Sequence, residues 1–213
     1  MLFLYLTDKL FEGKFRFLSF GEVILLMAEA GRKILVLFSS PHSKGTCACM
    51  LEECLKCLSE TDAVTSFDAF QMRPEPCFDC GWCKEHQGCV LPDLNAFMVA
   101  YEQADIVIIC APVYNLSFPA PLKSIFDRFQ RYFNARFCLG IKPPIAKPKQ
   151  ALLLLCSGSK DKTGFDIIKK QAEMVFTVLN TTLSGMVCLP DTDKKPELDK
   201  ALLQIRQAVS ALQ

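Results

Sequence analysis

The chain has 213 residues, 51% of them hydrophobic, and a formal net charge of +1 at pH 7. This length allows one large domain with a sizeable core, and the composition argues against disorder and against a nucleic-acid partner. No apolar stretch of about 18 residues is free of charge and no cleavable signal peptide is recognisable, so we predict a cytoplasmic protein without a membrane segment. The twelve cysteines should then stay reduced, and clustered ones more often bind metal.

The first thirty residues are apolar and aromatic but follow neither a helical nor a strand period. They suit a short helix that packs on the domain, or a segment outside it. We favour the second interpretation, which makes residues 1–30 an N-terminal extension and residues 31–213 the domain.

The rest of the chain alternates between short apolar runs and amphipathic stretches. Unbroken apolar runs are typical of strands buried on both faces of a sheet, and apolar residues three or four apart are typical of helices. Thr163 and Asp166 resemble the capping box that begins a helix. The strands are expected at 34–38, 63–70, 105–111, 151–156 and 186–189, and the helices at 46–58, 92–103, 119–137, 163–179 and 196–212.

Strands that alternate with helices in this way predict a parallel sheet covered on both faces. Five such units indicate an α/β, doubly wound, five-stranded parallel sheet of the flavodoxin-like kind, with strand order 2-1-3-4-5. Ligands of such sheets bind outside the carboxyl ends of the strands, between the first and the third. The loops at 39–46 and 112–117 follow these two strands, so they are the candidate ligand loops.

The loop at 39–46 is rich in hydroxyl groups and leads into a helix. Unpaired N–H groups and the positive end of the helix dipole make such a place suitable for a phosphate group. An ordinary strand-to-helix turn is the alternative that the spacing alone leaves open.

From about Gly31 onwards the chain resembles the NADPH-dependent FMN reductase superfamily, and within it the iron–sulfur flavoprotein branch. The phosphate loop of that family is similar to Ser39-Ser-Pro-His-Ser-Lys-Gly-Thr-Cys47, and its flavin loop to Pro112-Val-Tyr-Asn-Leu-Ser117. Leu122-Lys123 and Asp127-Arg128 follow in the family's order. The departures are His42 and Ser43 in place of a basic pair, and Thr46-Cys47 in place of Asn-Thr, which change side-chain contacts but keep the backbone donors.

The resemblance implies FMN as the cofactor, and FMN itself carries the redox chemistry, so we expect no catalytic acid or nucleophile. Tyr114 would stack on or flank the flavin ring, or belong to the core, and the glycine of Ser157-Gly158 would allow close approach or merely begin a helix. The phosphate would be held by Ser40, His42, Ser43, Lys44, Thr46 and Cys47, and the ring would lie along Pro112, Val113, Tyr114, Asn115, Leu116 and Ser117, beside Ser157 and Gly158.

Four cysteines stand apart from the others because they lie in one loop at 77–89 with Pro, Gly and Asp. Cys77, Cys80 and Cys83 follow a Cys-x2-Cys-x2-Cys pattern, and Cys89 comes soon after. This tight spacing is typical of ferredoxin loops around a [4Fe–4S] cluster, whereas structural zinc sites usually use two separated pairs. We predict the cluster, with zinc as the alternative. The remaining eight cysteines are interpreted as packing residues.

Two classes of function remain. The chain is predicted to be an oxidoreductase that passes electrons from NAD(P)H or a reduced carrier through FMN to an acceptor. The altered phosphate loop favours the alternative, a non-catalytic flavodoxin-like carrier or a metal-stabilised binding module. The expected partners are small-molecule or protein electron donors and acceptors, and a homo-oligomer is predicted from the family. The aromatic helix with Phe126, Phe129, Tyr132, Phe133 and Phe137 is either a dimer face or core.

Overall fold

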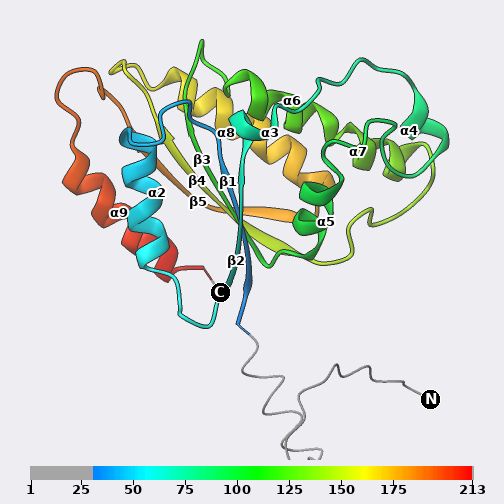
Figure 1. Ribbon diagram of the computed structural model, residues 1–213, viewed down its shortest axis with the longest axis horizontal. Coiled ribbons are helices and arrows are strands. Elements are labelled where there is room, and N and C mark those ends of the chain that lie inside the picture. Colours follow the sequence, from blue (N-terminus) through cyan, green and yellow to red (C-terminus); the bar gives the residue numbers. More distant parts are fainter. Residues whose placement is uncertain (1–30, 213) are drawn as a thin grey trace, which may run out of the picture. The chain divides into compact units, whose positions relative to one another are not determined.

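The computed structural model describes residues 31–212, which build a five-stranded sheet with helices on both faces (Figure 1). All neighbouring strands run parallel, in the order β2-β1-β3-β4-β5, as predicted. The strands are β1 (Lys33–Phe38), β2 (Ala63–Asp68), β3 (Ile106–Pro112), β4 (Lys149–Cys156) and β5 (Thr181–Leu189).

The three central strands, β1, β3 and β4, are buried on both faces, as their apolar composition predicts. Every residue of β3 is buried, as are Ile34–Leu37 of β1, because helices cover both faces of the sheet at these positions. Ile34 is in register with Ile106, so two apolar runs lie side by side. Their carboxyl ends meet at one edge, which is where ligands of such sheets bind.

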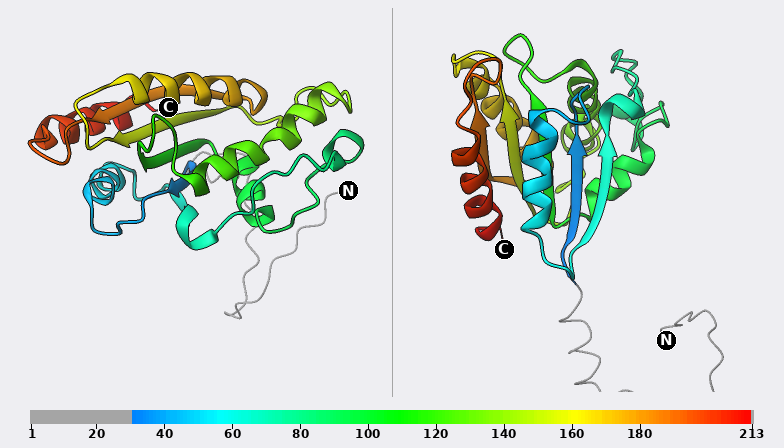
Figure 2. Two further views of the ribbon diagram at one scale, coloured as in Figure 1. Left: turned by 90° about the horizontal axis from the view of Figure 1, so that it is seen from above. Right: turned by 60° about the vertical axis from the view of Figure 1, so that its left-hand side comes forward.

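The helices divide between the two faces of the sheet (Figure 2). One face is covered by α2 (Thr46–Lys56) and α9 (Leu198–Ser210), and the opposite face carries the aromatic part of the core. The helices of that second side are α3 (Ala69–Met72), α4 (Trp82–Glu85), α5 (Asn95–Gln103), α6 (Ala120–Arg128), α7 (Gln130–Phe137) and α8 (Thr163–Val178).

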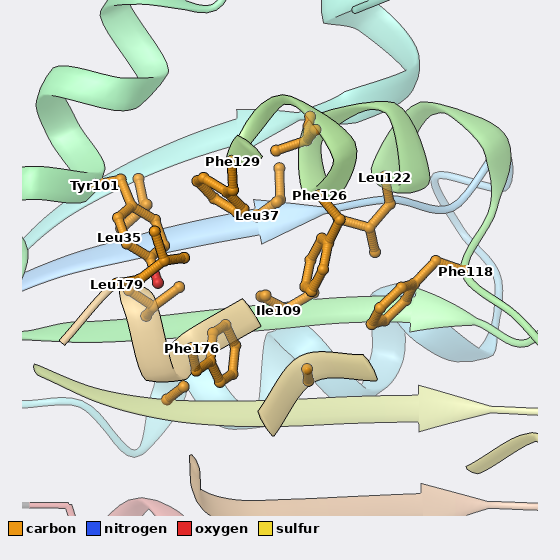
Figure 3. Close-up of a cluster of buried hydrophobic side chains, with 14 of the residues drawn as sticks. Leu35, Leu37, Tyr101, Ile109, Phe118, Leu122, Phe126, Phe129, Phe176 and Leu179 are labelled. Atoms are coloured by element: carbon orange, nitrogen blue, oxygen red, sulfur yellow. The ribbon is translucent and has the colours of Figure 1, made fainter. Parts of the chain in front are cut away.

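The two faces have different cores. On the α6 and α8 side, aromatic rings interlock, and Figure 3 shows Phe126 and Phe129 directed towards the sheet. The rings of Tyr101 and Phe129 have centroids 5.0 Å apart. On the α2 and α9 side the core is aliphatic and contains the thiols of Cys47, Cys54, Cys110 and Cys156.

The predicted helix at 119–137 is wrong as a single element, because it breaks at Phe129. This residue, with φ −66° and ψ −8°, stays in the right-handed helical region, but it lies outside both helices and is the C-cap of α6 and the N-cap of α7. The break places Phe129 in the core, at 2% exposure. Phe126, Phe129 and Tyr132 are therefore core residues, whereas Phe133 and Phe137 are exposed with ring centroids 4.5 Å apart.

The fifth strand begins earlier than predicted, at Thr181 rather than Met186. This strand lies at the edge of the sheet, and Thr182 and Ser184 in its first half are exposed. The first half therefore lacks the apolar run by which buried strands are predicted from sequence. The predicted capping box is also absent: the Thr163 hydroxyl donates to Asp161, 2.7 Å away, and α8 has no side-chain cap.

Three further boundaries differ from the predictions. The second strand ends at Asp68, whose carboxylate accepts hydrogen bonds from Phe70 and Gln71 and so begins α3. The helices expected from 92 and 196 begin at Asn95 and Leu198. Two of the eight cysteines interpreted as packing residues, Cys49 and Cys138, are exposed.

The predicted extension at 1–30 lies outside the described residues, so the domain boundary stays a prediction. Among the described residues no helix combines the length and the apolar character needed to cross a membrane.

Candidate functional site

The first candidate loop joins β1 to α2. Ser39 directly follows β1, and its N–H donates to the Cys110 carbonyl oxygen at 2.8 Å. The first-turn N–H groups of α2 have no acceptor inside the helix, and the N-cap residue Gly45 provides no side-chain cap. The buried Ser39 hydroxyl has no hydrogen-bond partner within residues 31–212. This end of the sheet therefore offers uncommitted donors.

The second candidate loop is a tight turn that follows β3. Tyr114 and Ser117 exchange two backbone hydrogen bonds of 2.9 Å, and Asn115 and Leu116 between them have φ values of 50° and 62°. Two consecutive left-handed residues are the signature of a type I′ turn. The turn leaves Tyr114 and Leu116 exposed at 42% and 47%, so Tyr114 is not a core residue.

The third candidate segment, Ser157-Gly158, follows β4. Gly158 lets a side chain approach the backbone closely, because a Cβ there would lie 2.3 Å from a carboxylate oxygen of Asp193, which would have to move away. Asp193 belongs to the loop after β5, and Thr192 of that loop donates its N–H to the Ser157 carbonyl oxygen at 3.0 Å. Four strand ends therefore contribute loops to the same edge.

These segments enclose a cavity of about 430 Å³. It brings together eight of the fourteen predicted cofactor residues, together with Cys156, Thr192 and Asp193, which the sequence analysis missed. The position of Thr192 and Asp193 could have indicated them, because they follow the fifth strand at the carboxyl edge of the sheet, where the ligand was predicted to bind. The predicted residues at this cavity are Ser40, His42, Thr46, Cys47, Pro112, Val113, Tyr114 and Gly158.

The other six predicted residues lie around this cavity rather than in its wall. Asn115, Leu116 and Ser157 line an adjoining hollow of about 300 Å³, which also includes Val113 and Gly158. Ser43 lines a hollow of about 480 Å³ beside α3. Lys44 is exposed, and Ser117 is the partner of Tyr114 in the turn.

The floor of the cavity contains a group of thiols. Cys47 Sγ lies 2.9 Å from Cys156 Sγ, and the Cys110 thiol donates to the Cys47 carbonyl oxygen at 3.2 Å. The hydrogen bond with Cys110 and burial raise the pKa of Cys47, and the hydrogen bond with Cys47 and burial raise the pKa of Cys156. The thiols of Cys47 and Cys156 are therefore uncharged near neutral pH, which does not suit a nucleophile.

The four-cysteine loop lies elsewhere, with α4 beside α7 (Figure 1). Cys77 and Cys80 are exposed, and Cys83 and Cys89 are partly buried. Within residues 31–212 no three His, Cys, Asp or Glu side chains are grouped so as to hold a metal ion. The structure thus places the predicted ligands in one loop without bringing their sulfur atoms together.

The comparisons with known proteins agree with this fold. The model of the NADPH-dependent FMN reductase family matches residues 32–192. An iron–sulfur flavoprotein of Methanocaldococcus jannaschii is 29% identical over 98 residues, 45% of this chain and 51% of that protein. An iron–sulfur flavoprotein of Archaeoglobus fulgidus is 26% identical over 151 residues, 69% of this chain and 72% of that protein.

Among solved structures, an NAD(P)H:quinone oxidoreductase from Methanothermobacter marburgensis superposes with a TM-score of 0.65. It shares 22% identity with this chain, and the match covers 84% of this chain and 95% of that one, so the likeness concerns the fold. The chain spans about half the length of the Methanocaldococcus relative. The match of the family model over most of the domain shows that this chain belongs to the NADPH-dependent FMN reductase family.

Proposed function

We propose that the protein is an FMN-dependent oxidoreductase that moves electrons from NAD(P)H or a reduced carrier to an acceptor. The observation that carries the proposal is the cavity of about 430 Å³, in which the loops after β1, β3, β4 and β5 meet. Family membership supports FMN, and the likeness to the Methanothermobacter structure, which is an NAD(P)H:quinone oxidoreductase, supports the type of reaction.

The residues at the cavity fit a flavin mononucleotide. The uncapped N-terminus of α2 and the hydroxyls of Ser40 and Thr46 would bind the phosphate, because donors and a helix dipole point to one place. Bound FMN would supply the transfer of electrons between donor and acceptor. The exposed turn at Tyr114 would border the ring, and Cys47 would contribute its backbone N–H, because its thiol is buried against Cys156.

One feature of the cavity opposes a phosphate. Asp193 adds a carboxylate to the wall, and a like charge weakens the binding of an anion. Asp193 packs against Gly158 at the β4 side, whereas the free donors lie at the α2 side. We therefore place the phosphate at α2 and the ring towards Tyr114.

We further propose that Cys77, Cys80, Cys83 and Cys89 bind a [4Fe–4S] cluster, with zinc as the alternative. The support is the donor set, because four soft thiolates suit iron–sulfur clusters and zinc. The loop can also bend around a metal: Asp79, Gly81 and Gly88 have φ values of 50°, 78° and 96°. Two relatives are named iron–sulfur flavoproteins, which agrees with the proposal.

The test is turnover by protein purified anaerobically and loaded with FMN. NADH and NADPH are each supplied with a quinone acceptor, and their oxidation is followed by absorbance. We expect turnover that requires FMN. Protein that binds FMN but oxidises neither nicotinamide with any quinone would contradict the enzyme and favour an electron carrier.

The metal is tested separately by iron, sulfide and zinc analysis of the same preparation. We expect iron and sulfide, and we expect Cys80→Ala to lose the iron while it keeps FMN. Cys49→Ala is the matched control, because Cys49 is an exposed cysteine on α2, outside the loop. Full zinc occupancy without sulfide would contradict the cluster.

A further inference from the structure

Arg128 ties together the two ends of the four-cysteine loop. This arginine is 2% exposed, and its guanidinium donates to the carbonyl oxygen of Glu75 at 3.0 Å and to that of Leu91 at 2.7 Å. It also pairs with a carboxylate oxygen of Asp93 at 3.0 Å, and the second oxygen of Asp93 accepts the Glu75 N–H at 3.0 Å. Glu75 precedes Cys77 and Leu91 follows Cys89, so one buried cation closes the base of the loop.

The placement of Arg128 indicates a specific role. A charged group is buried only when it is paired and hydrogen-bonded, because its desolvation is costly. Each of these partners belongs to the segments that flank the loop, and Arg128 does not line the cofactor cavity. Its contacts therefore hold the two ends of the loop together. The separation of these ends limits how far apart the cysteines within the loop can lie.

Asn134 makes a second contact with this loop, at a predicted ligand. The side chain is 3% exposed, and its Nδ2 donates to Cys83 Sγ at 3.2 Å. Its Oδ1 accepts from the Cys138 thiol at 3.7 Å, which keeps the N–H side of the amide directed at Cys83. A donor to a ligand sulfur holds it in place and shares the negative charge that it carries in a metal centre.

We propose that Arg128 and Asn134 are positioning residues of the metal centre at the four-cysteine loop. Arg128 acts at the base of the loop, and Asn134 acts at Cys83. The proposal rests on the metal centre proposed above. The two contacts come from neighbouring helices, because Arg128 is the last residue of α6 and Asn134 lies in α7.

The first test replaces Asn134 by leucine, which keeps the number and branching of the side-chain heavy atoms and removes the donor. We expect Co²⁺ to bind the reduced, metal-free full chain about 10–100-fold more weakly, the usual effect of losing such a partner. In anaerobically purified protein we expect the reduction potential of the cluster to become more negative, which a purely structural residue would not cause. Gln130→Leu, an exposed position on the same helix, is the control.

The second test addresses the base of the loop. Arg128→Met should lower Co²⁺ affinity at least tenfold and leave the FMN dissociation constant within about twofold of that of the wild type. Lys123→Met is the matched control, since Lys123 pairs with Asp127 on α6 and does not contact the loop. Should Arg128→Met fold poorly, Asp93→Asn weakens the same clamp from a partly exposed partner.

The outcomes separate the two proposals. Cys80-dependent metal binding in the wild type, weakened in Asn134→Leu and in either clamp variant, supports the inference. Equal affinity and potential in the wild type and these variants would overturn it and leave the metal centre in place. A wild type that binds neither iron nor Co²⁺ through Cys80 would overturn both.

Discussion

Cys47 in the first turn of α2 and Cys156 at the end of β4 have their sulfur atoms 2.9 Å apart. Both are buried, at 2% and 6% exposure, and both line the cavity of about 430 Å³. This contact packs the N-terminal turn of α2 against the end of β4. In the family motif that this loop resembles, the position of Cys47 is a threonine, so here a small apolar thiol stands in place of a hydroxyl that could bind phosphate.

The first prediction follows from this burial. Iodoacetamide at pH 8 should leave Cys47, Cys110 and Cys156 unmodified in the native protein and modify them after denaturation, because alkylation requires an accessible thiolate. Cys49, exposed on the same helix, is the internal control and should react in both states. Fragment masses locate the label, and native labelling of Cys47 as fast as that of Cys49 would contradict the structure.

The second prediction concerns the phosphate end of the cavity. Thr46→Asp should raise the FMN dissociation constant roughly tenfold or more, because it brings a like charge to the proposed phosphate position at the start of α2. Quenching of FMN fluorescence on titration measures the constant.

Two matched variants sharpen this test. Thr46→Ser keeps the hydroxyl and should bind FMN nearly as well as the wild type. Asp193→Asn removes a carboxylate from the cavity wall and should bind FMN more tightly. Unchanged affinity in both Thr46→Asp and Asp193→Asn would place the phosphate elsewhere.

The sequence predicted the strand order, because β1, β3 and β4 are buried on both faces and read as apolar runs. It missed the start of β5, where an edge strand exposes Thr182 and Ser184. The break at Phe129 was not predictable either. It depends on where the aromatic ring finds space in the core, and helical periodicity continues through it.

The candidate site was predictable in its location but not in its composition. Topology places the loops after β1 and β3 at one edge, and the cavity confirms that they meet. Asp193 was missed because the loop after β5 carries no recognisable motif, although it ends at the same edge of the sheet. Arg128 was recognised as part of a motif, but its contacts with Glu75 and Leu91 span 53 and 37 residues and carry no local signal.

The third prediction concerns pH and stability. Burial and the nearby charge of Lys147 lower the pKa of Lys149 to about 8. In the unfolded chain this lysine has its ordinary pKa near ~10.4. Folding therefore disfavours its charged form below pH 8, and the wild type gains stability from this group as pH rises from about 8 to 10.4.

Lys149→Met should accordingly raise the free energy of unfolding at pH 7 by about 1–3 kcal/mol, an advantage that shrinks towards pH 10. Urea unfolding at both pH values measures the effect, and Lys170→Met, at an exposed position on α8, is the control. An advantage that is equal at both pH values would contradict the lowered pKa of Lys149. A loss of stability at pH 7 would show that the Lys149 contacts with Lys147 and the Tyr101 ring outweigh the cost of its burial.

The central claim is that FMN occupies the cavity at the carboxyl ends of the strands. The measurement that tests it most directly is the flavin content of the purified full chain, released by denaturation and quantified by absorbance, together with titration of flavin-free protein. We predict about one FMN per chain and saturable quenching of FMN fluorescence that Thr46→Asp weakens. A colourless protein that leaves FMN fluorescence unchanged at every concentration would contradict the account.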